Sequence, residues 1–259
     1  MSDAIIQLDN IGKHFGNVIA LSGVSFDVRP GECHCLLGDN GAGKSTFIKV
    51  MSGVHKPTKG SIKMDGRTVS FDSPREAMEA GIATVFQDLA MIPLMSVTRN
   101  FFMGREPQKG WGPFRRFDTE HANAVTMTQM QEMGINLRAP DQAVGTLSGG
   151  ERQTVAIARA VYFGAKILIL DEPTSALGVR QTSNVLATVD KIRSQGIGIV
   201  FISHNVRHAL AVGDRFTVLN RGKTHGTAKR GDISPEELQD LMAGGQELAE
   251  LEGSLKGTV

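Results

Sequence analysis

A glycine-rich loop near the N-terminus carries the residue types that bind phosphate. It follows a G-x-x-x-x-G-K-[ST] pattern and consists of Gly38, Asp39, Asn40, Gly41, Ala42, Gly43, Lys44, Ser45 and Thr46. Glycines let the backbone curl around an anion without Cβ clashes, and the helix expected after the loop adds unpaired N–H groups and the positive end of its dipole. Lys44 would then reach the β- and γ-phosphates, and the Ser45 hydroxyl would ligate Mg²⁺. The loop therefore predicts a nucleotide site.

Two acidic residues follow a fully apolar run farther along the chain. Residues 167–170 are Ile-Leu-Ile-Leu and end in Asp171-Glu172. Ligands bind at the carboxyl ends of strands in open α/β sheets, where Asp171 would help to hold Mg²⁺. Glu172 would act as the general base on an attacking water. An isolated Asp-Glu pair is more often a solvated loop, but the apolar strand and the upstream phosphate loop favour the catalytic interpretation.

A third motif comprises Leu147, Ser148, Gly149, Gly150 and Glu151. It is typical of a capping box at a helix start, with Ser148 as N-cap and Glu151 at the third helical position. A helix start with two glycines is also a second anion site, so the two interpretations are compatible. This motif resembles the signature sequence of ATP-binding cassette (ABC) ATPases. With the other motifs, the resemblance to that family covers about residues 5–230.

The resemblance implies roles for further residues. Gln87 matches a glutamine that contacts Mg²⁺ and links the core to a helical subdomain, and it joins Glu172 and His204 in the expected catalytic set. His204 matches a histidine that contacts the γ-phosphate, and Phe15 matches an aromatic ring that stacks on adenine. Without the family, His204 and Phe15 would be assigned structural roles. The His204–His208 spacing would suggest a metal pair, but a third ligand is not evident.

In this family the signature of one subunit closes on the ATP held by the phosphate loop of the other. The resemblance therefore implies a head-to-tail homodimer with two shared ATP sites. Two positions depart from the family pattern: Glu151 replaces a glutamine, and Gly178 replaces an aspartate. The second departure bears on how tightly the two sites communicate, but neither removes a group that performs the chemistry, so we expect ATP hydrolysis to survive.

The segments 77–100 and 171–182 resemble ATPase subunits of bacterial monosaccharide importers, of the single-cassette fructose/ribose-type branch. This implies integral-membrane permease subunits, an extracytoplasmic (periplasmic) sugar-binding protein as an indirect partner, and a peripheral position on the cytoplasmic face of the bacterial inner membrane. The alternatives are a cassette for another importer substrate, an exporter cassette, a non-transport ABC ATPase and a cassette that binds ATP without turnover.

The elements that position these motifs indicate an α/β fold, an ABC cassette of the P-loop NTPase type. We expect one ATPase domain at 1–245, in which 1–87 and 165–245 form a mostly parallel core with an N-terminal antiparallel β part. A helical subdomain is inserted at 88–164, and the composition of the tail at 246–259 allows disorder. Two continuous apolar strands separated by a helix, 167–170 and 197–203, indicate parallel pairing.

Turn and helix-capping residues predict the remaining strands and helices. The runs 5–8 and 24–28 are expected to be antiparallel strands with turns at Gly12, Gly16 and Gly23, and hairpins are expected at Asp65-Gly66 and Arg221-Gly222. Helices are expected to begin after the caps Ser73, Asp118 and Ser234 and to cover 97–103, 151–161 and 182–193.

The composition bears on which kinds of partner the protein binds. The chain of 259 residues has 28 basic and 27 acidic side chains, and no basic patch predicts nucleic-acid binding. The N-terminus does not have the features of a signal peptide, and the longest apolar runs are too short to cross a bilayer. We therefore expect any membrane connection to run through a partner. Cys33 and Cys35 lie two apart on one strand and are expected to pack in the core.

Overall fold

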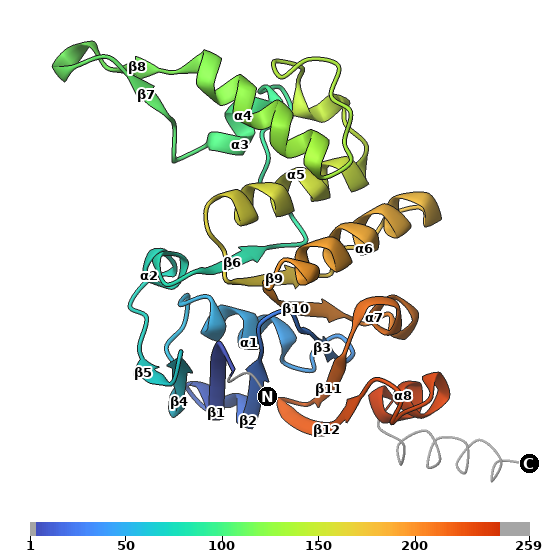
Figure 1. Cartoon of the computed structure of the whole chain (residues 1–259). Coiled ribbons are helices and arrows are strands. Elements are labelled where there is room, and N and C mark those ends of the chain that lie inside the picture. The colour runs from blue at the N-terminus through green and yellow to red at the C-terminus, as the bar shows by residue number, and fades with distance from the viewer. Residues whose placement is uncertain (1–3, 244–259) are drawn as a thin grey trace, which may run out of the picture.

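A computed structural model describes residues 4–243 of the chain, and the predicted tail at 246–259 lies outside them. The described residues form a six-stranded sheet, a four-stranded sheet and a separate helical part above them (Figure 1). The six-stranded sheet runs in the order β12 (Lys223–Lys229), β11 (Arg215–Asn220), β3 (Cys33–Leu37), β10 (Gly198–Ser203), β9 (Ile167–Asp171) and β6 (Ile82–Val85).

The five strands from β6 to β11 each pair in parallel with their neighbours, and only β12 is antiparallel to β11. β9 and β10 pair directly, which confirms the parallel arrangement predicted from their apolar runs. Along β9, Ile167 and Ile169 pack on one face of the sheet while Leu168 and Leu170 pack on the other. Because both faces are buried, the strand needs no polar alternation.

Helix α1 (Lys44–Met51) lies between this sheet and the four-stranded sheet (Figure 1). The opposite face is covered by α6 (Val179–Ser194), α7 (Val206–Val212) and α8 (Pro235–Met242) and by part of α5 (Gly149–Tyr162). Cys33 and Cys35 are fully buried on that same face, as predicted. The parallel sheet is therefore a core with apolar layers on both sides.

The four-stranded sheet has the order β2 (Val18–Val28), β1 (Ile6–Phe15), β4 (Lys59–Met64) and β5 (Arg67–Val69). β1 and β2 extend well beyond the runs 5–8 and 24–28 that the sequence indicated. Only Gly16 lies in a turn, whereas Gly12 and Gly23 lie inside the strands, so the turns expected at those two glycines were wrong. The β1–β2 pairing contains several register shifts. Glycine is typical of such irregular strand positions as well as of turns.

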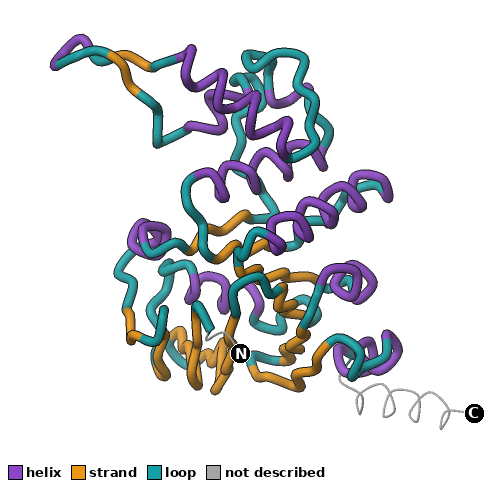
Figure 2. Tube along the Cα trace, viewed as in Figure 1, coloured by secondary structure: helices purple, strands orange, loops and turns teal. Residues whose placement is uncertain are grey.

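The helical part contains α3 (Val97–Phe102), α4 (Thr119–Glu132) and the first turns of α5, which share an apolar cluster of their own (Figures 1 and 2). Met130 of α4 is fully buried in this cluster, and Val125 and the C-cap residue Met133 are partly buried against it. A short hairpin of β7 (Gln108–Lys109) and β8 (Arg116–Phe117), with a 3₁₀ turn at Gly112–Phe114, was not predicted, nor was a second 3₁₀ turn at Val144–Thr146.

The helix starts predicted from N-capping residues are confirmed. Ser73 accepts a hydrogen bond at the start of α2 (Pro74–Glu79), and Asp118 and Ser234 do the same for α4 and α8. The predicted hairpin turn at Asp65-Gly66 has positive φ at both residues, as does the turn at Arg221-Gly222. Within residues 4–243, each helix is either too short or too polar to traverse a lipid bilayer.

Candidate functional site

The predicted site residues gather where the parallel strands end. In the sheet register, Leu37 pairs with Ser203, Ile202 pairs with Asp171, and Leu170 pairs with Val85. The residues that follow these strands therefore line up along one edge, which brings Gly38, Asp171, Glu172, His204 and Gln87 together. This is the edge at which open α/β sheets bind ligands.

The phosphate loop connects β3 to α1 across this edge. Gly38 has φ 150°, and a Cβ there would lie 2.4 Å from the carbonyl oxygen of Leu219 on β11, so only glycine fits. Gly43 precedes the helix with φ 105°. The buried Lys44 ammonium donates to the carbonyl oxygens of Gly38 (2.6 Å) and Asp39 (3.1 Å). The lysine is thus held over the loop with two neutral oxygens as partners, which phosphate oxygens of higher charge could replace.

A cavity of about 480 Å³ lies on this loop. Apart from the loop, its walls come from the start of β2 and from the β11–β12 turn. The lining residues are Val18, Ile19, Ala20, Asp39, Asn40, Gly41, Gly43, Lys44, Ser45, Thr46, Arg221 and Gly222. The sequence indicated Arg221-Gly222 only as a turn, and no pattern linked it to the phosphate loop. Its place in the lining follows from β11 lying beside β3.

Phe15 is not part of this lining. It ends β1 close to the cavity wall, 43% exposed, with the edge of its ring against His55 (ring centroids 5.2 Å apart) and the Lys13 ammonium 5.1 Å from its centroid. Val18 and Ile19, three and four residues on, are 65% and 60% exposed. An exposed aromatic ring beside exposed aliphatic side chains offers apolar surface next to the phosphate loop, and a nucleobase can stack on such surface.

Glu172 and His204 form a direct pair. The Nδ1 of His204 donates to Oε1 of Glu172 at 2.8 Å, and the Ser203 hydroxyl donates weakly to the other carboxylate oxygen at 3.4 Å. Because an ionised carboxylate can only accept, this contact places the proton on Nδ1 and leaves Nε2 to face a ligand. Glu172 has φ 49°, a left-handed conformation that is uncommon outside glycine and clusters at functional sites.

A second layer of polar residues supports this pair, and sequence reasoning missed it. Ser203 also accepts from the backbone N–H of Asn205 at 3.0 Å, and the Asn205 side chain caps α7 at His208. His208 Nδ1 lies 2.9 Å from the Thr174 hydroxyl. Burial lowers the pKa of His208, and the nearby Glu172 carboxylate opposes that shift. His208 therefore belongs to the polar layer near Glu172, with its ring nitrogens beside Thr174 and Asn205.

Asp171 is the carboxylate that suits a divalent cation. Burial raises its pKa, the neighbouring Glu172 raises it further, and the Lys44 ammonium opposes both. Two carboxylates in one half-buried place favour a bound cation. Within residues 4–243, no group of three or more His, Cys, Asp and Glu side chains is arranged to hold a metal. Mg²⁺ characteristically takes one or two protein carboxylates and completes its shell with phosphate and water, so Asp171 and Ser45 fit it when nucleotide is present.

The signature residues 147–151 do not line the cavity on the phosphate loop. They begin α5 with the capping box that the sequence indicated. The Ser148 backbone N–H donates to the Glu151 carboxylate at 2.7 Å, and the Glu151 N–H donates to the Ser148 hydroxyl at 3.3 Å. Gln or Glu serves this motif equally, which accounts physically for Glu151 in place of the family glutamine. Gly149 and Gly150 lie against Leu177, in the loop that follows Glu172, and against Gln181, in the first turn of α6.

Gly178, the second departure, is the N-cap of α6 and has an extended backbone (φ −70°). A Cβ there would meet no atom within 4 Å. We therefore expect Gly178→Asp to fold normally and to gain a few tenths of a kcal/mol, because aspartate caps a helix better than glycine. Thermal unfolding should show a Tm that is unchanged or about 1 °C higher. Gly38→Ala is the contrasting variant and should be strongly destabilised, because its Cβ would clash with the Leu219 carbonyl oxygen. A Tm of Gly178→Asp several degrees below that of the wild type would contradict the open space found around Gly178.

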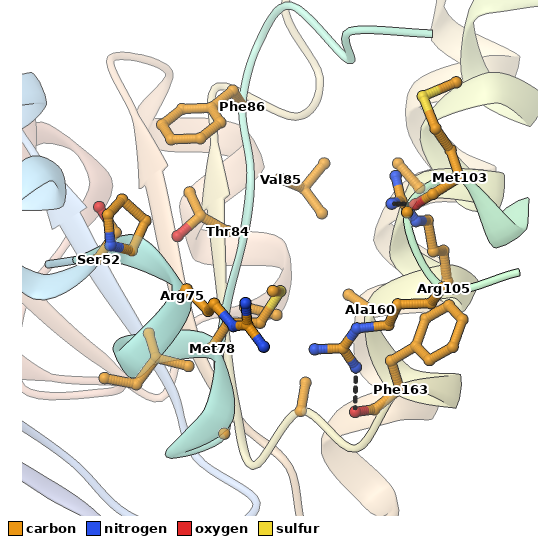
Figure 3. Close-up of a pocket in the computed structure, with 18 of the residues that line it drawn as sticks. Ser52, Arg75, Met78, Thr84, Val85, Phe86, Met103, Arg105, Ala160 and Phe163 are labelled. Carbon is orange, nitrogen blue, oxygen red and sulfur yellow. Dashed lines mark hydrogen bonds between the residues drawn. The ribbon is translucent and has the colours of Figure 1, made fainter. Parts of the chain in front are cut away.

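Gln87 is exposed and follows β6, and its neighbour Phe86 lines a second, larger hollow of about 910 Å³ (Figure 3). This groove separates α2 and β6 from the helical part, and Figure 3 shows side chains from both sides pointing into it. Its floor is apolar, with Met78, Val85 and Ala160, and basic groups stand at Arg75 and Arg105. Arg105 donates to the Phe163 carbonyl oxygen and stacks over the Phe163 ring at 4.9 Å.

Comparisons with known proteins agree with this geometry. A family described as "ABC transporter" matches residues 21–175. The xylose/arabinose import ATP-binding protein XylG of Sulfolobus acidocaldarius is 41% identical over 93% of this chain and 94% of that protein. The fructose import ATP-binding protein FrcA of Rhizobium meliloti is 40% identical over 95% and 96%. The ribose import ATP-binding protein RbsA 2 of Burkholderia pseudomallei is 40% identical over 93% of this chain, which spans 46% of that relative.

Solved structures resemble the fold over nearly its whole length. A nucleotide-free ATP-binding cassette from an ABC transporter has a TM-score of 0.79 at 25% identity, covering 93% of this chain and 96% of that one. A dimeric ATP-binding cassette in a post-hydrolysis state, bound to ADP and phosphate, has a TM-score of 0.73 at 25% identity, covering 88% and 100%.

Proposed function

Because this chain belongs to the ABC transporter family, in which it is an ATPase cassette, we propose that it powers the import of a monosaccharide through a membrane permease. The observation that carries the proposal is the similarity to the xylose/arabinose and fructose import subunits, which extends over nearly the whole of both chains. A similarity confined to the phosphate loop and the acidic strand would be shared by ATPases of many other functions.

ATP fits the described site as follows. The adenine ring lies on Phe15 beside Val18 and Ile19, and the phosphates lie in the loop, where Lys44 exchanges its carbonyl partners for β- and γ-oxygens. Ser45, Asp171 and Gln87 are the residues that would hold Mg²⁺, which neutralises phosphate charge when bound. The raised pKa of Asp171 supports this assignment, because a cation favours the ionised carboxylate.

Hydrolysis then depends on the Glu172–His204 pair. Glu172 accepts a proton from the attacking water as general base, and the His204 Nδ1–H holds its carboxylate in one orientation. Nε2, on the other side of the imidazole ring, faces the γ-phosphate, and when it also carries a proton it donates to an oxygen of the phosphoryl group that is transferred. The left-handed backbone of Glu172 supports this role, since strain of that kind persists where a side chain must be held in place.

A second copy of the chain completes each site. Residues 147–151 form a capped helix start with unpaired N–H groups and a positive dipole end, and they lie outside the cavity of their own chain. In a head-to-tail homodimer they close on the γ-phosphate held by the partner subunit. ATP binding thus joins the two copies, and hydrolysis removes the bridging charge and reopens them.

The large groove is the permease contact in this proposal. Gln87 directly follows Phe86, which lines the groove, so a contact of Gln87 at the γ-phosphate can be passed to a segment lying in the groove. An apolar floor with basic rims suits an amphipathic helix of the permease. The chain would then work at the cytoplasmic face of a bacterial inner membrane, with a sugar-binding protein on the other side.

The experiment measures uptake of labelled pentoses and hexoses in cells from which the gene has been deleted. We expect uptake of at least one monosaccharide to fall on deletion and to return with the wild-type gene but not with Glu172→Gln. Unchanged uptake of every monosaccharide tested would contradict sugar import and would favour another importer substrate.

A variant in the groove separates transport from hydrolysis. Ala160→Arg places a long side chain in the groove on a helix that tolerates arginine, so we expect uptake to fall at least tenfold while the purified chain keeps its ATPase activity. Ala124→Arg, on the exposed face of α4, is the matched control and should leave both unchanged. Normal uptake by Ala160→Arg would exclude the groove as the permease contact.

A further inference from the structure

The β7–β8 hairpin, residues 108–117, displays two large aromatic side chains to solvent. Trp111 is 86% exposed and Phe114 is 81% exposed, both in the turn between the strands. Figures 1 and 2 show the hairpin as a thin ribbon that projects beyond α3 and α4, on the side of the molecule where α2 lies. Exposing two aromatic rings at the tip of a projection is unfavourable in water, and such apolar patches mark interaction sites.

The turn that carries these rings is preformed. Gly110 has φ 104°, and a Cβ there would lie 2.4 Å from the Phe114 carbonyl oxygen, so the chain can approach itself only at glycine. The Phe114 N–H donates to the Trp111 carbonyl oxygen at 3.1 Å, and Pro113, one of the two residues between them, has its φ fixed by its ring. The backbone that carries the two rings therefore forms a defined turn closed by a hydrogen bond.

The base of the hairpin is fastened to the helical part. The Asp118 N–H donates to the Pro107 carbonyl oxygen at 2.8 Å, and Lys109 pairs with the Asp118 carboxylate at 3.4 Å. The Arg99 guanidinium of α3 lies 5.2 Å from the centroid of the Phe117 ring. Only two residue pairs join the strands, which is too little to stabilise an isolated hairpin, so these contacts at the base hold it in place.

The charge of the hairpin is of one sign. Residues 107–117 include Lys109, Arg115 and Arg116 and no acidic residue, although the chain as a whole carries 28 basic and 27 acidic side chains. Arg115 and Arg116 are exposed, and within residues 4–243 neither takes part in an ion pair. Tryptophan and basic side chains together are typical of protein surfaces that lie in the headgroup region of a bilayer.

We propose that the β7–β8 hairpin binds the surface of an anionic bilayer directly, with Trp111 and Phe114 in the interfacial region and Arg115 and Arg116 on lipid phosphates. The groove residues Met103, Gly104 and Arg105 lead straight into the hairpin, so a cassette docked on a permease would hold the hairpin near the membrane. The inference rests on the proposed function only in that docking on a permease places the hairpin near the membrane. It adds a direct lipid contact to the partner-mediated connection that composition predicts.

Trp111 is the only tryptophan of the chain and reports on the hairpin alone. The full-length protein is titrated with vesicles of phosphatidylglycerol and phosphatidylethanolamine, and separately with phosphatidylcholine vesicles. We expect the anionic vesicles to shift Trp111 emission to shorter wavelength, brominated acyl chains to quench it, and salt to weaken the effect because headgroup attraction is screened. Emission unchanged by anionic vesicles at low salt would overturn the proposal.

Variants test the two parts of the surface while Trp111 is kept. Arg115→Gln combined with Arg116→Gln should weaken binding to anionic vesicles by roughly 25-fold, since each basic side chain contributes about a fivefold factor. Phe114→Ser should reduce the quenching by brominated chains. Arg67→Gln combined with Arg138→Gln removes two exposed arginines elsewhere and should bind as the wild type does. Equal loss in this control pair would reduce the effect to net charge and contradict a specific hairpin contact.

A contact with permease protein gives a different result. Trp111 emission would then be unchanged by pure lipid and would shift only in membrane vesicles that contain the assembled transporter, which would overturn the lipid assignment. Pure-lipid vesicles contain neither permease nor sugar. A failed vesicle titration therefore leaves the sugar-import proposal intact, and failed sugar uptake leaves the vesicle result intact.

Discussion

Glu172→Gln is expected to lower the ATP turnover number by about 10²–10⁴-fold, which is the range that general-base catalysis contributes. The amide has nearly the same shape as the carboxylate and can still accept from His204 Nδ1, whose hydrogen bond to Glu172 measures 2.8 Å. It cannot accept a proton from water. Because the phosphate loop is untouched, ATP binding should stay within about twofold of wild type, and the two copies should remain joined with ATP between them.

Phosphate release and size-exclusion chromatography in ATP check both halves of this expectation. The matched control is Glu120→Gln, an exposed residue in the first turn of α4, which should hydrolyse ATP at the wild-type rate. If Glu172→Gln hydrolysed ATP at the wild-type rate, the base would have to be another residue. If it lost ATP binding as well, Glu172 would act in binding and not in the chemical step.

Ser148→Arg is expected to lower ATPase activity by at least about a hundredfold, because it removes a donor from the transition-state charge and fills the place of the γ-phosphate. Binding of nucleotide to the isolated chain should be nearly unchanged, since residues 147–151 do not line the cavity on the phosphate loop. The measurement pairs ATP turnover with equilibrium binding of a fluorescent ATP analogue.

The arginine also removes a helix cap, so its effect on folding needs a control. Ser234→Arg removes the same kind of capping box from α8, where Ser234 and Glu237 exchange the equivalent hydrogen bonds. Each loss should cost about 1 kcal/mol of stability, and only Ser148→Arg should lose activity. Equal activity of the two variants would contradict a role for Ser148 beyond capping.

The fold was predictable where local chemistry agrees with tertiary packing. The apolar run of β9 has both faces buried, and the caps at Ser73, Asp118 and Ser234 bind the backbone groups that their positions predict. The turns wrongly predicted in the antiparallel sheet also have a physical explanation. Gly12 and Gly23 satisfy the rules for turns, but glycine also suits irregular strand positions, and pairing with the neighbouring strand decides between the two.

The sequence predicts which residues belong to the site but not the contacts between their side chains. Motif spacing named Lys44, Asp171, Glu172 and His204, and the strand register brings the ends of their strands to one edge. The pattern could not show that Glu172 and His204 pair directly, because that contact depends on the backbone of Glu172.

Other parts of the site come from segments that carry no motif of their own. Arg221-Gly222 reaches the cavity only because β11 lies beside β3. The support from Asn205 and His208 comes from α7, a short helix whose start is marked by a single capping asparagine. Contacts between distant strands leave no trace in local sequence, which is why these residues were missed.

The central claim is that each reaction centre is built from two copies of the chain. It is tested most directly by mixing Lys44→Ala with Ser148→Arg, each inactive alone. A mixed dimer pairs the intact phosphate loop of one variant with the intact signature of the other, so an equal mixture should recover up to about one quarter of wild-type ATPase activity for a two-fold head-to-tail assembly. A mixture no more active than the two variants measured separately would contradict the shared site.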